Sequence, residues 1–201
     1  SGSGKTTLLR IIAGLEHQTS GHIRFHGTDV SRLHARDRKV GFVFQHYALF
    51  RHMTVFDNIA FGLTVLPRRD RPNAAAIKAK VTKLLEMVQL AHLADRYPAQ
   101  LSGGQRQALT LLMATMVPPD LLLLDEHTAA LDPKTAELIM QLTDKIVKEK
   151  QLTTIMVTHN LRYAVEYGNR LVMMHNGHMI LDKKGKEKED MAIDDILTLF
   201  N

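Results

Sequence analysis

A run of four leucines, Leu121–Leu124, is the feature that most constrains the fold of this chain. The run is short and apolar throughout, as strands are when both faces of a parallel sheet are covered. Three further apolar segments have the pattern of strands: Val40–Phe44, Thr153–Val157 and Leu171–Met174. Because helical patterns separate these strands, the sequence predicts an α/β fold built on a parallel sheet.

The helical patterns are spread along the whole chain. We predict helices over Lys5–Ala13, Val55–Leu63, Ala74–Val88, Gly103–Met116, Pro133–Lys148, Leu161–Glu166 and Ile193–Phe200. Asp132 before Pro133 places a carboxylate at an N-cap and a proline at the first helical position. Ser102 and Gln105 fit a capping box. The charged run Lys183–Asp190 is predicted to be a solvated loop.

Composition narrows the class of protein. With 201 residues, 45% hydrophobic and 23% charged, the chain is long enough for one packed domain. The absence of cysteine excludes disulfides, thiolate catalysis and cysteine-based zinc sites, and it fits a reducing compartment. The net charge of +5 suits phosphate-bearing ligands. No apolar run reaches the length needed to cross a bilayer, and no secretory signal is evident.

The first residues have the form of a phosphate-binding loop that opens a helix. We assign phosphate binding to Ser1, Gly2, Ser3, Gly4, Lys5, Thr6 and Thr7. Lys5 would supply a cation to the β and γ phosphates, and the hydroxyl of Thr6 would bind Mg²⁺. The opening glycine of the motif is absent. Taken alone, the segment is also compatible with an ordinary glycine-rich helix start.

Two adjacent carboxylates, Asp125 and Glu126, end the leucine strand. In open α/β sheets, ligands bind at this carboxyl end. Asp125 is placed to bind Mg²⁺, directly or through water. Glu126 is the residue we expect to orient or deprotonate the attacking water in phosphoryl transfer.

The segment Leu101–Gln105, with sequence LSGGQ, adds a second helix start suited to an anion. With this segment, the chain resembles the nucleotide-binding domains of ABC transporters, whose signature is LSGGQ and whose motifs match in order. The resemblance implies a P-loop NTPase (RecA-like) core at residues 1–45 and 111–201, with an inserted helical subdomain at 46–110. It also implies that the usual strands before the phosphate loop, and an aromatic residue that stacks on adenine, are absent.

The resemblance assigns further residues. Gln45 would be the Q-loop residue that senses Mg²⁺ and the attacking water, and His159 would contact the γ-phosphate. In a head-to-tail dimer, the signature segment of one copy would close the site in which the other copy binds ATP. The interface residues implied are Ser102, Gly103, Gly104, Gln105 and Asp132. His127 stands where many relatives carry proline, so we expect the turn after the strand to differ.

The implied function is ATP hydrolysis that powers import across the bacterial inner membrane, with ATP and Mg²⁺ as cofactors. The implied partners are transmembrane permease subunits, a second nucleotide-binding domain and, indirectly, a substrate-binding protein. The location implied is cytoplasmic, peripheral on the inner face of the membrane. Residues up to about Gln105 resemble ATPases of sulfate/thiosulfate importers, and the remainder resembles another ABC subgroup, so we expect a composite chain.

Two other functions stay open at this point. One is an inactive or weakly active truncated or hybrid ABC fragment. The other is a soluble ABC-type ATPase that acts on nucleic acid, which the basic charge permits. We expect no nucleic-acid partner, because the run Arg68–Arg71 is short and no inserted coiled coil is evident.

Overall fold

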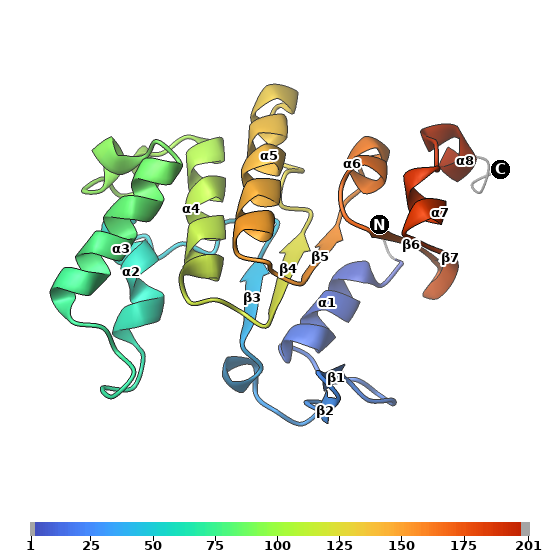
Figure 1. Ribbon diagram of the computed structural model, residues 1–201, viewed down its shortest axis with the longest axis horizontal. Coiled ribbons are helices and arrows are strands. Elements are labelled where there is room, and N and C mark those ends of the chain that lie inside the picture. Colours follow the sequence, from blue (N-terminus) through green and yellow to red (C-terminus); the bar gives the residue numbers. More distant parts are fainter. Residues whose placement is uncertain (1–2, 198–201) are drawn as a thin grey trace. The chain divides into compact units, whose positions relative to one another are not determined.

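Residues 3–197 are described by a computed structural model, and they form an α/β protein, which confirms the predicted fold class (Figure 1). By their internal contacts, the residues group into two units. We call Ser1–Arg38 with Met156–Asn201 the terminal unit, and Lys39–Ile155 the central unit. The predicted division, with a helical insertion at 46–110, has other bounds and stays a prediction.

The central unit is built on a parallel sheet. Strand β3 (Val40–Val43) pairs with β4 (Leu121–Asp125), and Val43 lies opposite Leu124. Strand β5 (Thr154–Val157) follows in the order β3-β4-β5. All residues of β4 are buried, which is why its sequence is apolar on both faces. The carboxyl ends of β3 and β4 therefore meet at one edge of the sheet.

Four α-helices belong to the central unit: α2 (Val55–Thr64), α3 (Ala74–Met87), α4 (Gly103–Met116) and α5 (Pro133–Glu149). Helix α4 packs against β3, α2 and α5, and α2 also packs against α3. Figure 1 shows α4, in light green, between α2 and α5. Because α4 has neighbours on several sides, most of its residues after the first turn are buried.

The terminal unit combines helices with two short antiparallel ribbons. Its elements are α1 (Lys5–Ala13), β1 (Arg24–Phe25), β2 (Thr28–Asp29), α6 (Leu161–Glu166), β6 (Arg170–His175), β7 (His178–Lys184), α7 (Lys186–Glu189) and α8 (Ile193–Leu197). Buried Arg38 donates through Nη1 to the carbonyls of Ile11 and Ile12, at 2.8 and 2.9 Å. These bonds add partners to carbonyl groups in the last turn of α1, where helical partners run out; the Ile11 carbonyl also accepts from the N–H of Gly14 at 3.1 Å.

The predicted helices all occur among the described residues. Lys5–Ala13, Gly103–Met116 and Leu161–Glu166 have the predicted bounds, and three others differ by one residue. The last predicted helix is present over Ile193–Leu197, and its predicted residues 198–200 lie outside the described residues. Both predicted caps are confirmed, since Asp132 accepts from the N–H of Thr135 and Ser102 forms a capping box.

One local prediction is wrong. The run Lys183–Asp190 is not a solvated loop, because it contains the end of β7 and the whole of α7. Lys188 is only 3% exposed, and its Nζ donates to the carbonyl of Val165 in α6. A charged run thus contributes a buried contact. Within residues 3–197, no helix combines the length and the apolar character needed to span a bilayer.

Candidate nucleotide-binding site

The described part of the predicted phosphate loop contains the start of a helix. Helix α1 starts at Lys5 after Gly4, which has φ 79°, a left-handed conformation that costs glycine little. The first turn carries no acidic residue. Its N–H groups lie at the positive end of the helix dipole, where negative charge is stabilised. Thr6 and Thr7 are exposed in this turn, whereas the predicted Ser1 and Gly2 lie outside the described residues.

His159 lies in the terminal unit, as the phosphate loop does. It occupies the turn between β5 and α6 and is exposed. The turn is fixed on both sides of it. The N–H of Asn160 donates to Oγ1 of Thr158 at 3.0 Å, and Oδ1 of Asn160 accepts from the N–H of Tyr163 at 3.3 Å. The position of the histidine is therefore set by the cap of α6.

The carboxylates stand where the sequence places them, at the end of β4. Asp125 is 5% exposed and Glu126 is half-buried. Glu126 has φ 49°, a left-handed conformation that is uncommon outside glycine and that clusters at functional sites. Its carbonyl accepts from the N–H of Ala129 at 2.9 Å, which closes a turn. Gln45 follows the end of β3 and, by the register of the two strands, lies at the same edge of the sheet.

His127, the residue that follows Glu126, is buried. It is 3% exposed, and its Nε2 lies 3.2 Å from Oγ1 of Thr143 in α5. Burial lowers the pKa of His127 to about 4, so the imidazole is neutral near neutral pH. The expectation that this turn differs from that of relatives stays a prediction; in this chain the His127 side chain is an internal contact between the turn and α5.

The signature segment begins α4 with the predicted capping box. Oγ of Ser102 accepts from the N–H of Gln105 at 3.2 Å, and Oε1 of Gln105 accepts from the N–H of Ser102 at 2.9 Å. The N–H groups of Gly103 and Gly104, in the first turn, have no partner within the helix by their position. They are the groups suited to a phosphate at this helix start.

Within the central unit, the signature lies against two other predicted segments. A Cβ added at Gly104 would lie 2.4 Å from Cγ2 of Thr135, so only glycine fits there. A Cβ at Gly103 would lie 3.1 Å from the hydroxyl of Tyr47 and 3.3 Å from Cδ2 of Leu131. The segment after Gln45, the signature and the turn before α5 therefore converge.

The Asp132 carboxylate caps α5 beside this junction. Its Oδ1 accepts from the N–H of Thr135 at 3.1 Å. Hydrogen bonds from the side chain and backbone of Thr135 lower the pKa of Asp132. Sequence reasoning missed two residues here, Thr135 and Tyr47. The ring of Tyr47 lies 5.0 Å from the guanidinium carbon of Arg106, and no local pattern signals that pairing.

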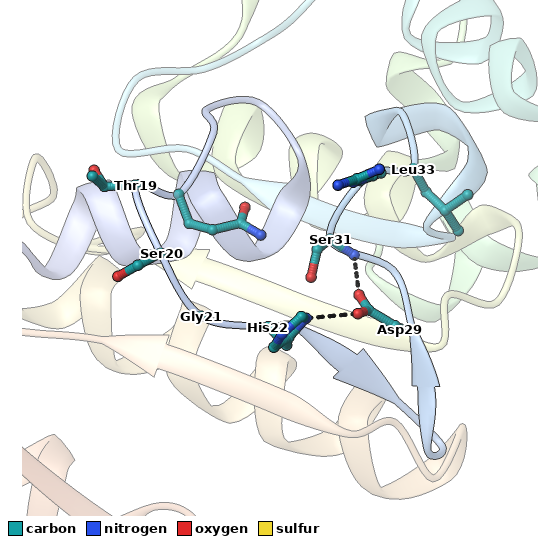
Figure 2. Close-up of a pocket in the computed structure, with 9 residues that line it drawn as sticks. Thr19, Ser20, Gly21, His22, Asp29, Ser31 and Leu33 are labelled. Carbon is teal, nitrogen blue, oxygen red and sulfur yellow. Dashed lines mark hydrogen bonds and ion pairs between the residues drawn. The ribbon is translucent and has the colours of Figure 1, made fainter.

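A separate pocket of about 420 Å³ lies in the terminal unit (Figure 2). It is lined by Gln18, Thr19, Ser20, Gly21, His22, Asp29, Ser31, Arg32 and Leu33. Figure 2 shows Asp29 between His22 and Ser31. Oδ2 of Asp29 lies 2.8 Å from Nδ1 of His22, and Oδ1 accepts from the N–H of Ser31 at 2.9 Å. Hydrogen bonds from Ser31 hold the pKa of Asp29 well below its usual range. No residue of the predicted nucleotide site lines this pocket.

Comparison with solved structures defines the class of protein. An ATP-binding cassette, described as a dimeric post-hydrolysis state bound to ADP and Pi, matches with a TM-score of 0.78 and 32% sequence identity. The match covers 90% of this chain and 81% of that one. The fold is that of a P-loop ATPase of the ATP-binding cassette type, as the sequence predicts.

Sequence comparison then gives the family. The profile described as ABC transporter matches residues 1–129. The sulfate/thiosulfate import ATP-binding protein CysA of Escherichia coli strain K12 is 72% identical over 179 residues, which is 89% of this chain and 49% of that protein. Proteins of the same name from Salmonella typhi and Yersinia pestis are 69% and 63% identical over the same shares. The chain belongs to the ABC transporter family.

The chain spans about half the length of the curated relatives that it matches. The sequence predicted a resemblance to sulfate importers up to about Gln105. The match to one such relative covers 179 residues and therefore extends well beyond that position. Similarity to that subgroup therefore continues into the second half of the chain.

Proposed function

We propose that this chain is the ATP-binding and ATP-hydrolysing part of an ABC importer of sulfate or thiosulfate. The observation that carries the proposal is the end of β4, where buried Asp125 is followed by Glu126 in a strained left-handed conformation. Such strain is retained where the backbone must aim a functional group. The relatives are named as sulfate/thiosulfate import ATP-binding proteins, which supports the choice of cargo.

The predicted residues divide the work of phosphate binding, metal binding and hydrolysis in this proposal. Lys5 and the N–H groups of the first turn of α1 bind the phosphates, and Thr6 and Asp125 hold Mg²⁺. The ion neutralises negative charge on the phosphates when it is bound. Glu126 orients the attacking water and takes its proton. Gln45 is a further ligand for Mg²⁺ and senses the attacking water. His159 contacts the γ-phosphate.

The active unit that we propose is a head-to-tail dimer. The signature residues Ser102, Gly103, Gly104 and Gln105, with Asp132, then close over ATP held by the other copy. The dimeric ATP-binding cassette to which this chain is similar supports that arrangement. Residues 46–110 form the helical subdomain that contacts the permease subunits, at the cytoplasmic face of the inner membrane. A substrate-binding protein would act through the permease.

The test is Mg²⁺-dependent ATP hydrolysis by the purified chain over a range of protein concentrations. A dimeric site predicts that activity rises faster than concentration. Lys5→Ala should lose nucleotide binding and turnover. Glu126→Gln should lose turnover, keep nucleotide binding and gain a stable ATP-bound dimer. Folded protein that binds no ATP, or Glu126→Gln with unchanged turnover, would contradict the proposal.

The cargo needs a separate test. Permease subunits of a bacterial sulfate importer, purified in detergent, should stimulate hydrolysis by the wild-type chain. The permease of an importer for an unrelated cargo is the matched control. Equal stimulation by both permeases would leave the ATPase assignment intact and contradict the assignment of sulfate or thiosulfate.

A further inference from the structure

We propose that His127 is a positioning residue for Glu126: its imidazole, tied to Thr143 of α5, fixes the turn that holds Glu126 in its left-handed conformation. The inference rests on the role given to Glu126 in the proposed function. It goes beyond that role, because it assigns the geometry of the carboxylate to a contact inside the central unit.

The strain at Glu126 needs a cause in the surrounding structure. A positive φ raises the free energy of a residue that has a Cβ, because the Cβ crowds the following carbonyl. Such a conformation persists only when neighbouring contacts over-determine it. At Glu126, with φ 49°, the strand ends on one side and a buried side chain follows on the other.

The buried side chain, His127, has a defined partner. Its Nε2 lies 3.2 Å from Oγ1 of Thr143, and both residues are buried. The hydroxyl of Thr143 donates its single hydrogen to the carbonyl of Ile139, at 2.7 Å. The same oxygen must therefore accept the hydrogen bond from His127, so Nε2 of the imidazole carries the hydrogen. The contact thus fixes both the ring and its tautomer.

The turn itself is closed by backbone bonds. The N–H of Ala129 donates to the carbonyl of Glu126 at 2.9 Å, and the N–H of Leu131 donates to that of Thr128 at 3.2 Å. These bonds shape the turn but do not attach it to its surroundings. The contact from His127 to α5 supplies that attachment, one residue away from Glu126.

Loss of the contact has a specific expected effect. Without it, the backbone at Glu126 can relax toward negative φ, and the carboxylate moves with it. In the proposed function, ATP is bound by the first turn of α1, through Mg²⁺ by Asp125, and by the signature of the other copy, and none of these groups belongs to the turn that follows Glu126. The turnover number should therefore fall while KM for ATP stays unchanged. A histidine that only fills the core would, when replaced, lower stability and leave turnover per folded molecule unchanged.

Amide hydrogen exchange tests the backbone part without any enzymatic readout. In the wild-type chain, the Ala129 amide should be protected, because it donates to Glu126. His127→Ala and Thr143→Val should lower that protection about tenfold or more relative to the Leu109 amide in α4, which reports global opening. Thr143→Ser keeps the hydroxyl and should keep the protection. Equal loss at both amides, or no loss at Ala129, would overturn the proposal.

Kinetics test the catalytic part. A misplacement of about 1 Å costs on the order of 100-fold in rate, so His127→Ala and Thr143→Val should lower kcat by roughly 10- to 100-fold at unchanged KM. His127→Gln should restore part of kcat, because its amide N–H can donate to Thr143 as Nε2 does. Full turnover in His127→Ala would overturn the role.

Failure of the proposed function gives a different result. A wild-type chain that binds ATP and never hydrolyses it contradicts the assignment of Glu126 as the catalytic base. The exchange measurement then decides the positioning contact alone: selective loss of protection at Ala129 supports it, and uniform protection overturns it.

Discussion

Replacing Gly104 by alanine should disrupt the contact between the signature helix and α5. The added Cβ would lie 2.4 Å from Cγ2 of Thr135, a separation that real Cβ atoms essentially never show. Thr135 has little freedom to retreat, because its N–H is bonded to Asp132 and its branched side chain has few rotamers. The next atom of Thr135, its Cβ, would lie at an ordinary 3.9 Å. The clash is therefore confined to one methyl group.

The magnitude follows from two opposing effects. Overpacking typically costs about 1–3 kcal/mol, and Gly→Ala in a helix gains up to about 1 kcal/mol. Gly104→Ala should therefore lower the free energy of unfolding by about 1–2 kcal/mol. In a Thr135→Ser background the methyl is gone and the hydroxyl remains, so the same change should be neutral or stabilising by up to about 1 kcal/mol. The coupling between the two sites should be about 2 kcal/mol.

The assay is urea unfolding of the wild type, the two single variants and the double variant. The four free energies of unfolding form a double-mutant cycle that isolates the contact. A coupling below about 0.5 kcal/mol, the usual error of additivity, would refute the steric argument. A Gly104→Ala chain as stable as the wild type would refute it as well.

The remaining predictions concern contacts elsewhere. Asn58→Ala should lower the free energy of unfolding by about 3 kcal/mol in urea, because the buried amide makes four hydrogen bonds to backbone groups; Asn58→Asp should not rescue it. Arg170 lowers the pKa of Asp182, so the carboxylate stabilises the fold above its ordinary pKa and loses this effect as the pH falls through the lowered value. The stability difference between wild type and Asp182→Asn should therefore be present at pH 7 and vanish in acid; a constant difference would contradict the pairing. Lys188→Met should cost about 1–3 kcal/mol in thermal unfolding, because the Val165 carbonyl loses its donor, and an unchanged Tm would contradict that role.

Local signals explain why the helices were predictable. Ser102 with Gln105 and Asp132 with Pro133 mark helix starts within a few residues, and the structure has helices at both. The leucine run likewise predicts β4, because burial on both faces requires an apolar sequence. These features depend on neighbours in the sequence, so the sequence alone was enough.

Contacts between distant segments explain what was not predictable. Strand β7 is stabilised by its pairing with β6. The sequence predicted a solvated loop at its charged end, because that pairing leaves no local signal. The positions of Tyr47 beside Gly103 and of Thr135 beside Gly104 depend on how helices pack. The residue types at the site were predicted, but the left-handed backbone at Glu126 and the burial of His127 were not, since both arise from tertiary contacts.

The register of β3 with β4 also sets an order of events in folding. Val40 pairs with Leu121, so the two strands meet only after the chain closes a loop of about 80 residues, at an entropic cost of about 4 kcal/mol. Helices α2, α3 and α4 lie inside that loop and contain mostly local contacts, which form quickly. The helices should therefore appear first, and the strand edge that carries Asp125 and Glu126 should become ordered last.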